Sequence, residues 1–149
     1  MRQLIVDDLE QCAIQSKQDI EYLIARGAGI SDQAMLEMPM HEWVKYEREY
    51  YEQLGDINEP DIIDDIDKDV LATYILKNPI EDVLEVIIRQ PRPKHHIGLS
   101  KADNDVARDK YYLARLTGIN AATFSQMHIG DWHILMVVIR DFLDKVRKI

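Results

Sequence analysis

The side chains best suited to chemistry in this sequence are a short run of histidine and aspartate, and their spacing is poor for metal binding. His128, Asp131 and His133 lie within six residues, and side chains of these types can ligate a metal. Ligands on one helix face should be three or four residues apart. The two histidines are five apart. The spacing therefore disfavours a metal site, and we predict no metal ligands.

The single cysteine and the paired histidines have structural explanations. Cys12 falls on the apolar face of a predicted helix, which favours a buried thiol over a nucleophile. His95 and His96 stand between Pro93-Lys94 and Ile97-Gly98, a context typical of an ordinary loop. The sequence contains no phosphate-binding glycine motif and no Gly-x-Ser-x-Gly nucleophile elbow. We therefore predict no catalytic residue and no cofactor, and expect a protein that is not an enzyme.

An acidic segment at residues 56–69 raises the possibility of calcium binding. It contains seven acidic residues and Pro60, and like charges at this density disfavour a helix. From Asp65 onward, three alternate aspartates have the spacing of an EF-hand loop. Such a loop needs Gly at its sixth position and Glu at its twelfth, where this chain has Val70 and Leu76. The segment is therefore predicted to be a solvated linker.

The composition excludes several classes of partner. The chain has 149 residues with 27 acidic and 18 basic side chains, giving a net charge of −9. Nucleic acids and anionic membranes bind positive surfaces, so neither is an expected partner. No segment approaches the roughly 18 apolar residues that span a bilayer. Asp7 and Asp8 follow the short apolar start, unlike a signal peptide. With one cysteine, we expect a soluble protein of a reducing cytoplasm.

The charge is unevenly distributed along the chain. Residues 1–67 contain 17 acids and 5 bases, whereas residues 68–149 contain 10 acids and 13 bases. Charge asymmetry of this kind suggests two modules with different surroundings. We predict an acidic helical module at 1–55, an acidic linker at 56–69, and a second module at 70–149.

The first module is predicted to be helical. Apolar residues recur at threes and fours over 9–24, which predicts one amphipathic helix that Gly29 ends. Ser31 is a suitable N-cap for a short helix ending before Pro39. A longer helix should follow at 41–54, with Trp43 on its apolar side.

The second module begins differently. Residues 70–76 and 83–88 are rich in β-formers and flank a turn-like connection at 77–82, which predicts a β-hairpin. Helices are then expected at 104–116 and 120–126, and a last one at 130–146. The predicted fold class is α+β and mainly α, with two small helical modules of which the second has an N-terminal β-hairpin.

The last predicted helix has apolar residues on two sides. One seam has nearly heptad spacing, and a second flank contains Ile134, Val137 and Val138. Such a helix is central to a core or lies in an interface, and we favour the core. The aromatic and aliphatic positions that could contact a partner are Trp43, Tyr46, Tyr50, Trp132, Ile134, Leu135, Val138 and Ile139.

The two modules contain an internal repeat at an offset of 89 residues. Over residues 25–43, six of 19 positions are identical, including Gly29 over Gly118 and Trp43 over Trp132. Ser31 also lies over Asn120, and both are N-cap residues. Convergence of two helical hairpins is the alternative. We favour a repeat because the glycine and the tryptophan stay in register.

Several short motifs of the second module occur in the same order in one known family. Arg89-Gln90-Pro91 closes the hairpin, and Leu-Ala-Arg-Leu-Thr-Gly occupies residues 113–118. Asp131-Trp132 and Asp141-Phe142-Leu143 follow. With these motifs, residues 72–149 resemble the tail assembly chaperones of Mu-like tailed bacteriophages.

The first module has a weaker resemblance to the companion modules of such chaperones. It lies in residues 30–51, where Met38, Trp43 and Tyr46 match the companion pattern. In that family the companion module follows the main module, whereas here it precedes it.

The resemblance implies a function in virion morphogenesis. A protein of this family binds the tape measure protein, keeps that long helical chain soluble and helps to recruit tail tube subunits. It acts in the host cytoplasm and leaves before the virion is complete. Separately from the resemblance, a homo-oligomer stays open, because the last predicted helix has a second apolar flank that an oligomer interface could cover. Two alternatives stay open at this point: a structural neck or tail completion protein retained in the virion, and a small acidic protein-binding adaptor.

Overall fold

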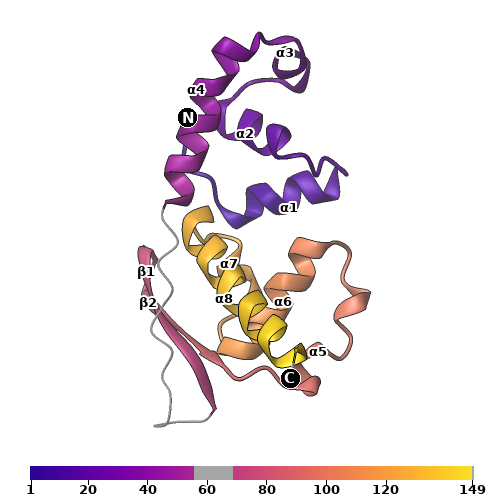
Figure 1. Ribbon diagram of the computed structural model, residues 1–149, viewed down its shortest axis with the longest axis vertical. Helices are drawn as coiled ribbons and strands as arrows, with labels where there is room; N and C mark the ends of the chain where they lie inside the picture. The colour runs from indigo at the N-terminus through magenta and orange to yellow at the C-terminus, as the bar shows by residue number, and fades with distance from the viewer. Residues whose placement is uncertain (56–68, 149) are drawn as a thin grey trace.

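The computed structural model describes residues 1–55 and 69–148, and over these ranges the fold is α+β and mainly helical, as predicted (Figure 1). The elements are α1 (Val6–Ile14), α2 (Ile20–Ala28), α3 (Asp32–Glu37), α4 (Met40–Leu54), β1 (Val70–Ile80), β2 (Val83–Arg89), α5 (Pro93–His96), the 3-10 helix η1 (Leu99–Lys101), α6 (Asp105–Thr117), α7 (Ala121–Phe124) and α8 (Ile129–Arg147). Of the predicted linker at 56–69, all but Asp69 lies outside the described residues.

The start of the chain differs from its prediction. The single helix expected at 9–24 is wrong, because the chain forms α1 and α2 with a break between them. Ser16 has a left-handed backbone with φ of 58°, and Lys17 N–H donates to the Cys12 carbonyl at 2.9 Å, which closes the end of α1. The apolar spacing continues across the break because both helices face the same cluster of buried residues, which contains Cys12 and Leu23.

The β-hairpin is longer than predicted. β1 continues to Ile80, which pairs with Val83, so the expected turn at 77–82 shortens to Glu81 and Asp82. A register irregularity between Ile75 and Ile80 accommodates Pro79 inside the strand. The inward-facing side chains are buried, whereas Ile75 on the outer face is 73% exposed.

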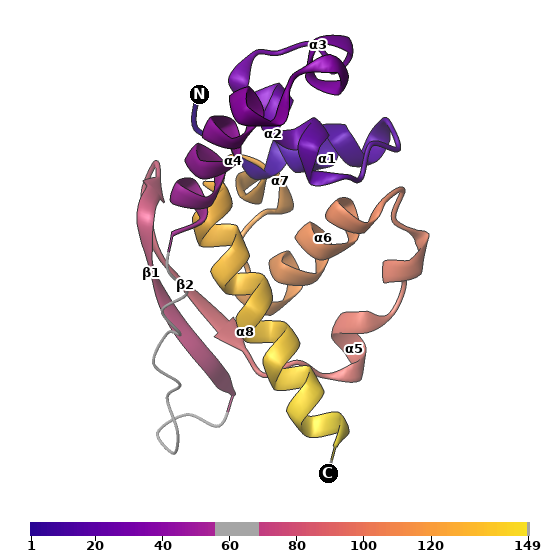
Figure 2. The same cartoon turned by 45° about the horizontal axis from the view of Figure 1, so that its top comes forward.

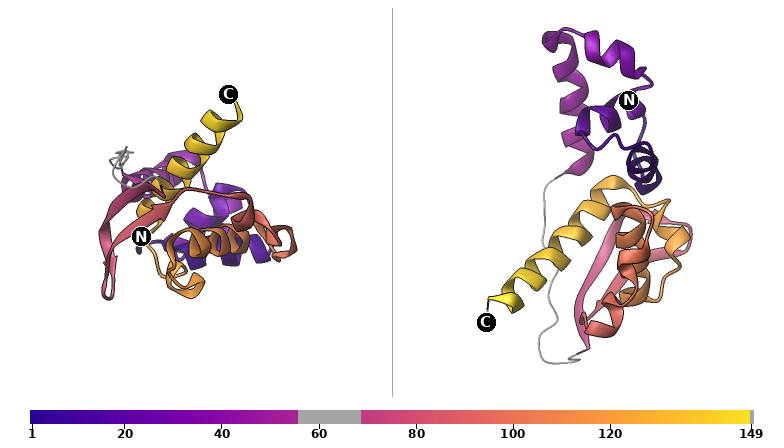
Figure 3. Two further views of the ribbon diagram at one scale, coloured as in Figure 1. Left: turned by 90° about the horizontal axis from the view of Figure 1, so that it is seen from below. Right: turned by 90° about the vertical axis from the view of Figure 1, so that its right-hand side faces the viewer.

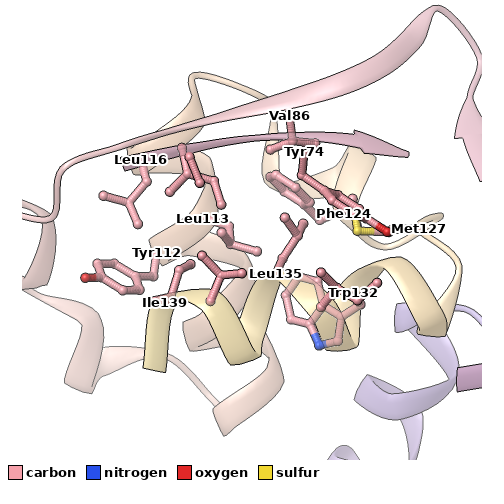
Figure 4. Close-up of a cluster of buried hydrophobic side chains, with 14 of the residues drawn as sticks. Tyr74, Val86, Tyr112, Leu113, Leu116, Phe124, Met127, Trp132, Leu135 and Ile139 are labelled. Atoms are coloured by element: carbon pink, nitrogen blue, oxygen red, sulfur yellow. The ribbon is translucent and has the colours of Figure 1, made fainter. Parts of the chain in front are cut away.

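Two clusters of buried side chains form the core. The larger one lies between the hairpin, α6, α7 and α8, and includes Leu113, Phe124 and Leu135 (Figure 4). The smaller one lies among α1, α2, α3 and α4. Val6 belongs to the larger cluster and Ile129 to the smaller, so each part of the chain contributes to the core of the other.

The two parts are also joined by direct contacts, α1 against α6 and α4 against α8. Figure 2 shows α1 to α4 at one end of the molecule, above α6 and α8. The buried Lys110 of α6 lies 2.7 Å from the Glu10 carboxylate of α1. Figure 3 shows α8 extending past the rest of the chain at its C-terminal end.

The repeat that the sequence predicts is present in the fold. We call α2, α3 and α4 the first unit, and α6, α7 and α8 the second unit. α3 and α7 begin 89 residues apart, and so do α4 and α8. The two glycines at the helix ends are both left-handed, with φ of 70° at Gly29 and 76° at Gly118. Ser31 and Asn120 each cap the following helix through a side-chain oxygen.

Candidate partner-binding groove

The side chains predicted to contact a partner lie mainly inside the protein. Seven of the eight are buried in the described structure, and Tyr46 is half-buried; the seven are Trp43, Tyr50, Trp132, Ile134, Leu135, Val138 and Ile139. α8 is apolar on two sides because both the hairpin and the neighbouring helices pack against it. In this structure these seven residues therefore belong to the core, the alternative that the sequence already favoured for α8, and offer little surface to a partner.

One of these seven residues, Ile139, also borders an open groove. The groove has a volume of about 700 Å³ and lies between α6 and α8, with α5 and η1 forming its far wall. Its apolar lining consists of Leu99, Tyr112, Met136, Ile139 and Leu143. Its polar lining consists of His96, Arg108, Asp109, Arg140, Asp144 and Arg147. An apolar floor with charged margins is typical of a surface that binds an amphipathic helix.

Two side chains of α6, Tyr112 and Arg115, hold α5 in place as part of the far wall of the groove. The Tyr112 hydroxyl and His96 Nε2 lie 2.9 Å apart, with their ring centroids separated by 4.8 Å. Arg115 donates to the backbone carbonyls of His95 at 3.0 Å and Ile97 at 2.6 Å. Burial raises the pKa of Tyr112, so its hydroxyl keeps its proton at neutral pH. The groove is therefore bounded by a braced wall.

α5 itself is absent from the prediction, which placed His95 and His96 in an ordinary loop. His95 is buried, and its Nδ1 accepts the backbone N–H of Arg92 at 2.9 Å. Pro93 occupies the first turn of α5, where a missing N–H costs no hydrogen bond. Burial, followed by the positive charges of Lys94 and Arg92, lowers the pKa of His95. At neutral pH His95 is therefore uncharged, and its Nδ1 can accept the Arg92 N–H where the chain leaves the hairpin and enters α5.

The margins of the groove have basic groups available for a ligand. Arg108 already forms contacts of 3.3 Å with Asp105 and Asp109. Neither Arg140 nor Arg147 forms an ion pair with any residue in 1–55 or 69–148. A partner with acidic residues beside its apolar stripe would therefore find uncompensated guanidinium groups here.

The groove continues along the C-terminal part of α8. A shallower hollow adjoins it, shares Leu143 and Arg147 with it, and adds Pro91, Phe142 and Val146. Together the two hollows follow α8 over residues 136–147, which at 1.5 Å per residue is roughly 18 Å, or about three helical turns. That length matches the i, i+4 and i+7 positions by which helix-binding grooves recognise one apolar face.

Two of the three residues weighed as metal ligands, His128 and Asp131, stabilise the fold instead. His128 caps α8, because its Nδ1 accepts the Gly130 N–H at 3.0 Å. Asp131 is fully buried, and its carboxylate accepts the Tyr74 hydroxyl at 2.7 Å and the backbone N–H groups of Lys77 and Asn78 at 3.0 Å. Burial and then the Asp131 carboxylate raise the pKa of Tyr74. No group of three metal-ligating side chains occurs within residues 1–55 and 69–148.

A second buried acid, which was not predicted from the sequence, holds the N-terminal segment. Asp8 accepts two hydrogen bonds from Arg2, at 2.9 and 2.7 Å, and one from Arg26 at 2.8 Å. It also accepts the Ile5 backbone N–H at 3.0 Å. Burial would raise the pKa of Asp8, but these donors outweigh burial and lower it to about 2. One sequence pattern could have indicated this site: an acid in the first turn of a helix, with one arginine before it and one after it in the chain.

The comparisons with known proteins give no identification. No family model matches the chain, and no curated protein or solved structure matches it. Among the helices in the described part of the chain, none combines the length and apolar character needed to cross a membrane.

Proposed function

We propose that this protein is a tail assembly chaperone of a tailed bacteriophage. In this role it binds an apolar helix of the tape measure protein, keeps that protein soluble and helps to bring tail tube subunits to it. The resemblance of residues 72–149 to such chaperones motivates the proposal. The observation that carries it is the open groove along α8, whose apolar lining and three-turn length suit one face of a helix.

The groove suits chaperone action because of how a tape measure protein exposes its surface. A long helical chain presents apolar stripes that associate with one another in water. Covering a stripe with Met136, Ile139 and Leu143 removes that surface from water. The net charge of −9 then keeps complexes apart by like-charge repulsion. The thioether of Met136 adapts to differing side chains, which suits a partner with many similar stripes.

The most specific motif of the resemblance lies at the C-terminal end of α6, next to the part of this helix that lines the groove. Leu113 and Leu116 are buried in the core, and Arg115 braces the α5 backbone. The Thr117 hydroxyl donates to the Leu113 carbonyl at 2.7 Å and accepts the Ile119 N–H at 3.1 Å, which closes the helix before Gly118. The motif thus holds the end of α6 in the core and, through Arg115, braces α5, which borders the groove, and this supports the proposal.

The proposal also covers where and when the protein acts. We propose that it is not an enzyme, acts in the host cytoplasm, and dissociates before the virion is complete. Purified virions should therefore lack it. Its presence in them in stoichiometric amounts would favour a structural tail protein instead.

Coexpression with the tape measure protein of the same phage tests the proposal. We expect the soluble fraction of that protein to rise with the wild-type chain and with Ile75→Asp, an exposed site on the hairpin. It should fall back with Met136→Glu combined with Leu143→Glu, because two charges then lie in the apolar lining. The proposal fails if the wild-type chain gives no increase, or if Ile75→Asp alone removes it.

A further inference from the structure

The repeat provides an internal comparison that points to a second binding surface. In the second unit, the segment before α8 pairs with the start of the chain. Ile5 and His128 form an isolated antiparallel bridge. Val6 N–H donates to the Met127 carbonyl at 2.9 Å, and Ile129 N–H donates to the Leu4 carbonyl at 3.0 Å. Ile129, which also belongs to the smaller core cluster, is only 2% exposed.

The first unit has the same backbone at the corresponding place. Pro39 precedes α4 with φ of −62° and ψ of 143°, and His128 precedes α8 with φ of −60° and ψ of 140°. The carbonyl of each accepts a hydrogen bond of 3.1 Å from the tryptophan four residues on. Met38 N–H donates to the Met35 carbonyl at 3.2 Å. In the second unit Met127 and Phe124 make the same bond at 3.1 Å. The Met38 carbonyl and the Met40 N–H therefore have the same local arrangement as the bridge-forming groups of the second unit.

Proline at position 39 is compatible with such pairing. The bridge in the second unit uses the carbonyl before His128 and the N–H after it, and both groups of His128 itself are left out. The missing N–H of Pro39 therefore removes no bond that an incoming strand would make.

The corresponding edge of the first unit is open. Among the residues that the structure describes, none forms a hydrogen bond with the Met38 carbonyl or the Met40 N–H. Met40 is 65% exposed, in contrast to 2% for its counterpart Ile129. Leu36 and Val44, four residues before and after Met40 in the chain, are 62% and 42% exposed. We call the Met38 and Met40 backbone groups, with these three side chains, the open edge.

We propose that the open edge binds an extended segment of another protein by adding one short antiparallel strand. The segment should have apolar side chains at alternate positions, as Leu4 and Val6 have, because these are the residues whose backbone pairs on either side of His128 and whose side chains are fully buried. It should also be basic, because the exposed side chains of Glu37 and Glu42 flank the open edge. This surface is separate from the groove.

A second copy of this chain is a poor occupant, because its own N-terminal segment is held. Leu4 N–H donates to Gln53 Oε1 at 2.8 Å, and Gln53 Nε2 donates to the Arg2 carbonyl at 2.9 Å. Arg2 and Asp8 form an ion pair at 2.7 Å. Leu4 and Val6 are fully buried. A copy that lent this segment would lose all these interactions, so the strand must come from a different chain.

Titration of the isotopically labelled full-length chain with a peptide tests the proposal by NMR. The probe is the amidated peptide Met-Arg-Gln-Leu-Ile-Val, which copies residues 1–6 with their strand pattern and single basic side chain. We expect saturable shifts in the amide signals of Leu36, Met40 and Val44. A peptide methylated on the valine nitrogen should bind about tenfold more weakly, since it lacks one hydrogen bond.

Two variants identify the surface. Met40→Asp should abolish the shifts, whereas Tyr51→Asp, an exposed position on the same helix, should preserve them. The proposal is overturned if the shifts are absent, if they occur only at Met127 to Ile129, or if the methylated peptide binds equally well. It is also overturned if the peptide-free chain is a dimer that Met40→Asp dissociates, because a second copy would then occupy the open edge.

Discussion

The first and second units show how one helical pattern acquires two different surfaces. Their helix ends, caps and tryptophans correspond at an offset of 89 residues. They differ in what covers them. The hairpin packs on α6 and α8, and the N-terminal segment pairs beside His128, whereas the corresponding segment around Pro39 is exposed. The local sequence therefore sets the unit, and the added elements decide which of its faces remain available.

Two equivalent arginines, one in each unit, also differ in the groups that they contact. Arg26 and Arg115 occupy equivalent positions near the ends of α2 and α6. Arg26 donates to the Asp8 carboxylate, whereas Arg115 donates to two backbone carbonyls near α5. Each arginine thus anchors whatever segment precedes its unit, through acceptors of a different kind.

The two tryptophans provide the largest expected effect. Trp43 and Trp132 are 4% and 5% exposed, so both should act as core residues of their own units. We expect Trp43→Ala and Trp132→Ala each to lower the free energy of unfolding by about 3–5 kcal/mol. Urea denaturation followed by circular dichroism measures this. If Trp43→Ala costs less than about 1 kcal/mol while Trp132→Ala costs the expected amount, the tryptophan is a core residue in the second unit only.

The acids one residue before the tryptophans should differ sharply. Asp131→Ala removes the acceptor of the buried Tyr74 hydroxyl and of the Lys77 and Asn78 N–H groups, so we expect a loss of about 3 kcal/mol. Glu42 is exposed, and Glu42→Ala should change stability by less than about 0.5 kcal/mol. Denaturant titrations of the two variants make the comparison. Equal losses would contradict the view that the hairpin distinguishes the second unit.

The anchor of the N-terminal segment predicts an acid-sensitive step. The pKa of Asp8 is lowered to about 2, below its unfolded value near 4, so its stabilisation is complete above about pH 4 and is lost as the pH falls toward 2. The expected loss is about 2 kcal/mol. Thermal unfolding measured between pH 5 and pH 2 checks this, with Asp8→Asn as the control. If Asp8→Asn keeps the full acid dependence, Asp8 is not its source.

The glycines that end α2 and α6 should give small and nearly equal effects. Both have left-handed backbones, and among the described residues no atom beyond the chain neighbours lies within 4 Å of the place that a Cβ would occupy. Only backbone strain then opposes a side chain, so Gly29→Ala and Gly118→Ala should each cost about 1 kcal/mol. Thermal denaturation of the two variants measures this. A difference above about 1 kcal/mol would show that the two helix ends are not equivalent.

Features with strong local patterns were predictable from the sequence. The caps Ser31 and Asn120, the stop at Gly118 and the start of β2 at Val83 depend on residues close in the chain, and the structure has each of them. The break between α1 and α2 was missed because it occurs inside a continuous apolar period, and Ser16 gives no strong turn pattern.

The groove could be predicted only in part. The two-sided apolar character of α8 identified the helix, but burial of its individual residues depends on the distant hairpin and on the α6 side chains of the same core cluster. The sequence therefore named Leu135 and Ile134, which are fully buried, and left out Met136 and Leu143, which line the groove. The open edge required comparison of two units in space, because it depends on where residues 4–6 lie.

Hydrogen–deuterium exchange of the chain, alone and in complex with the tape measure protein, tests the proposed binding mode most directly. We predict slower exchange in the complex along the second half of α8, over residues 136–147, and in α5 and η1, which form the opposite wall of the groove. The outer face of the hairpin around Ile75 should exchange as it does in the free chain. Unchanged exchange along α8, with protection at the hairpin, would contradict the account.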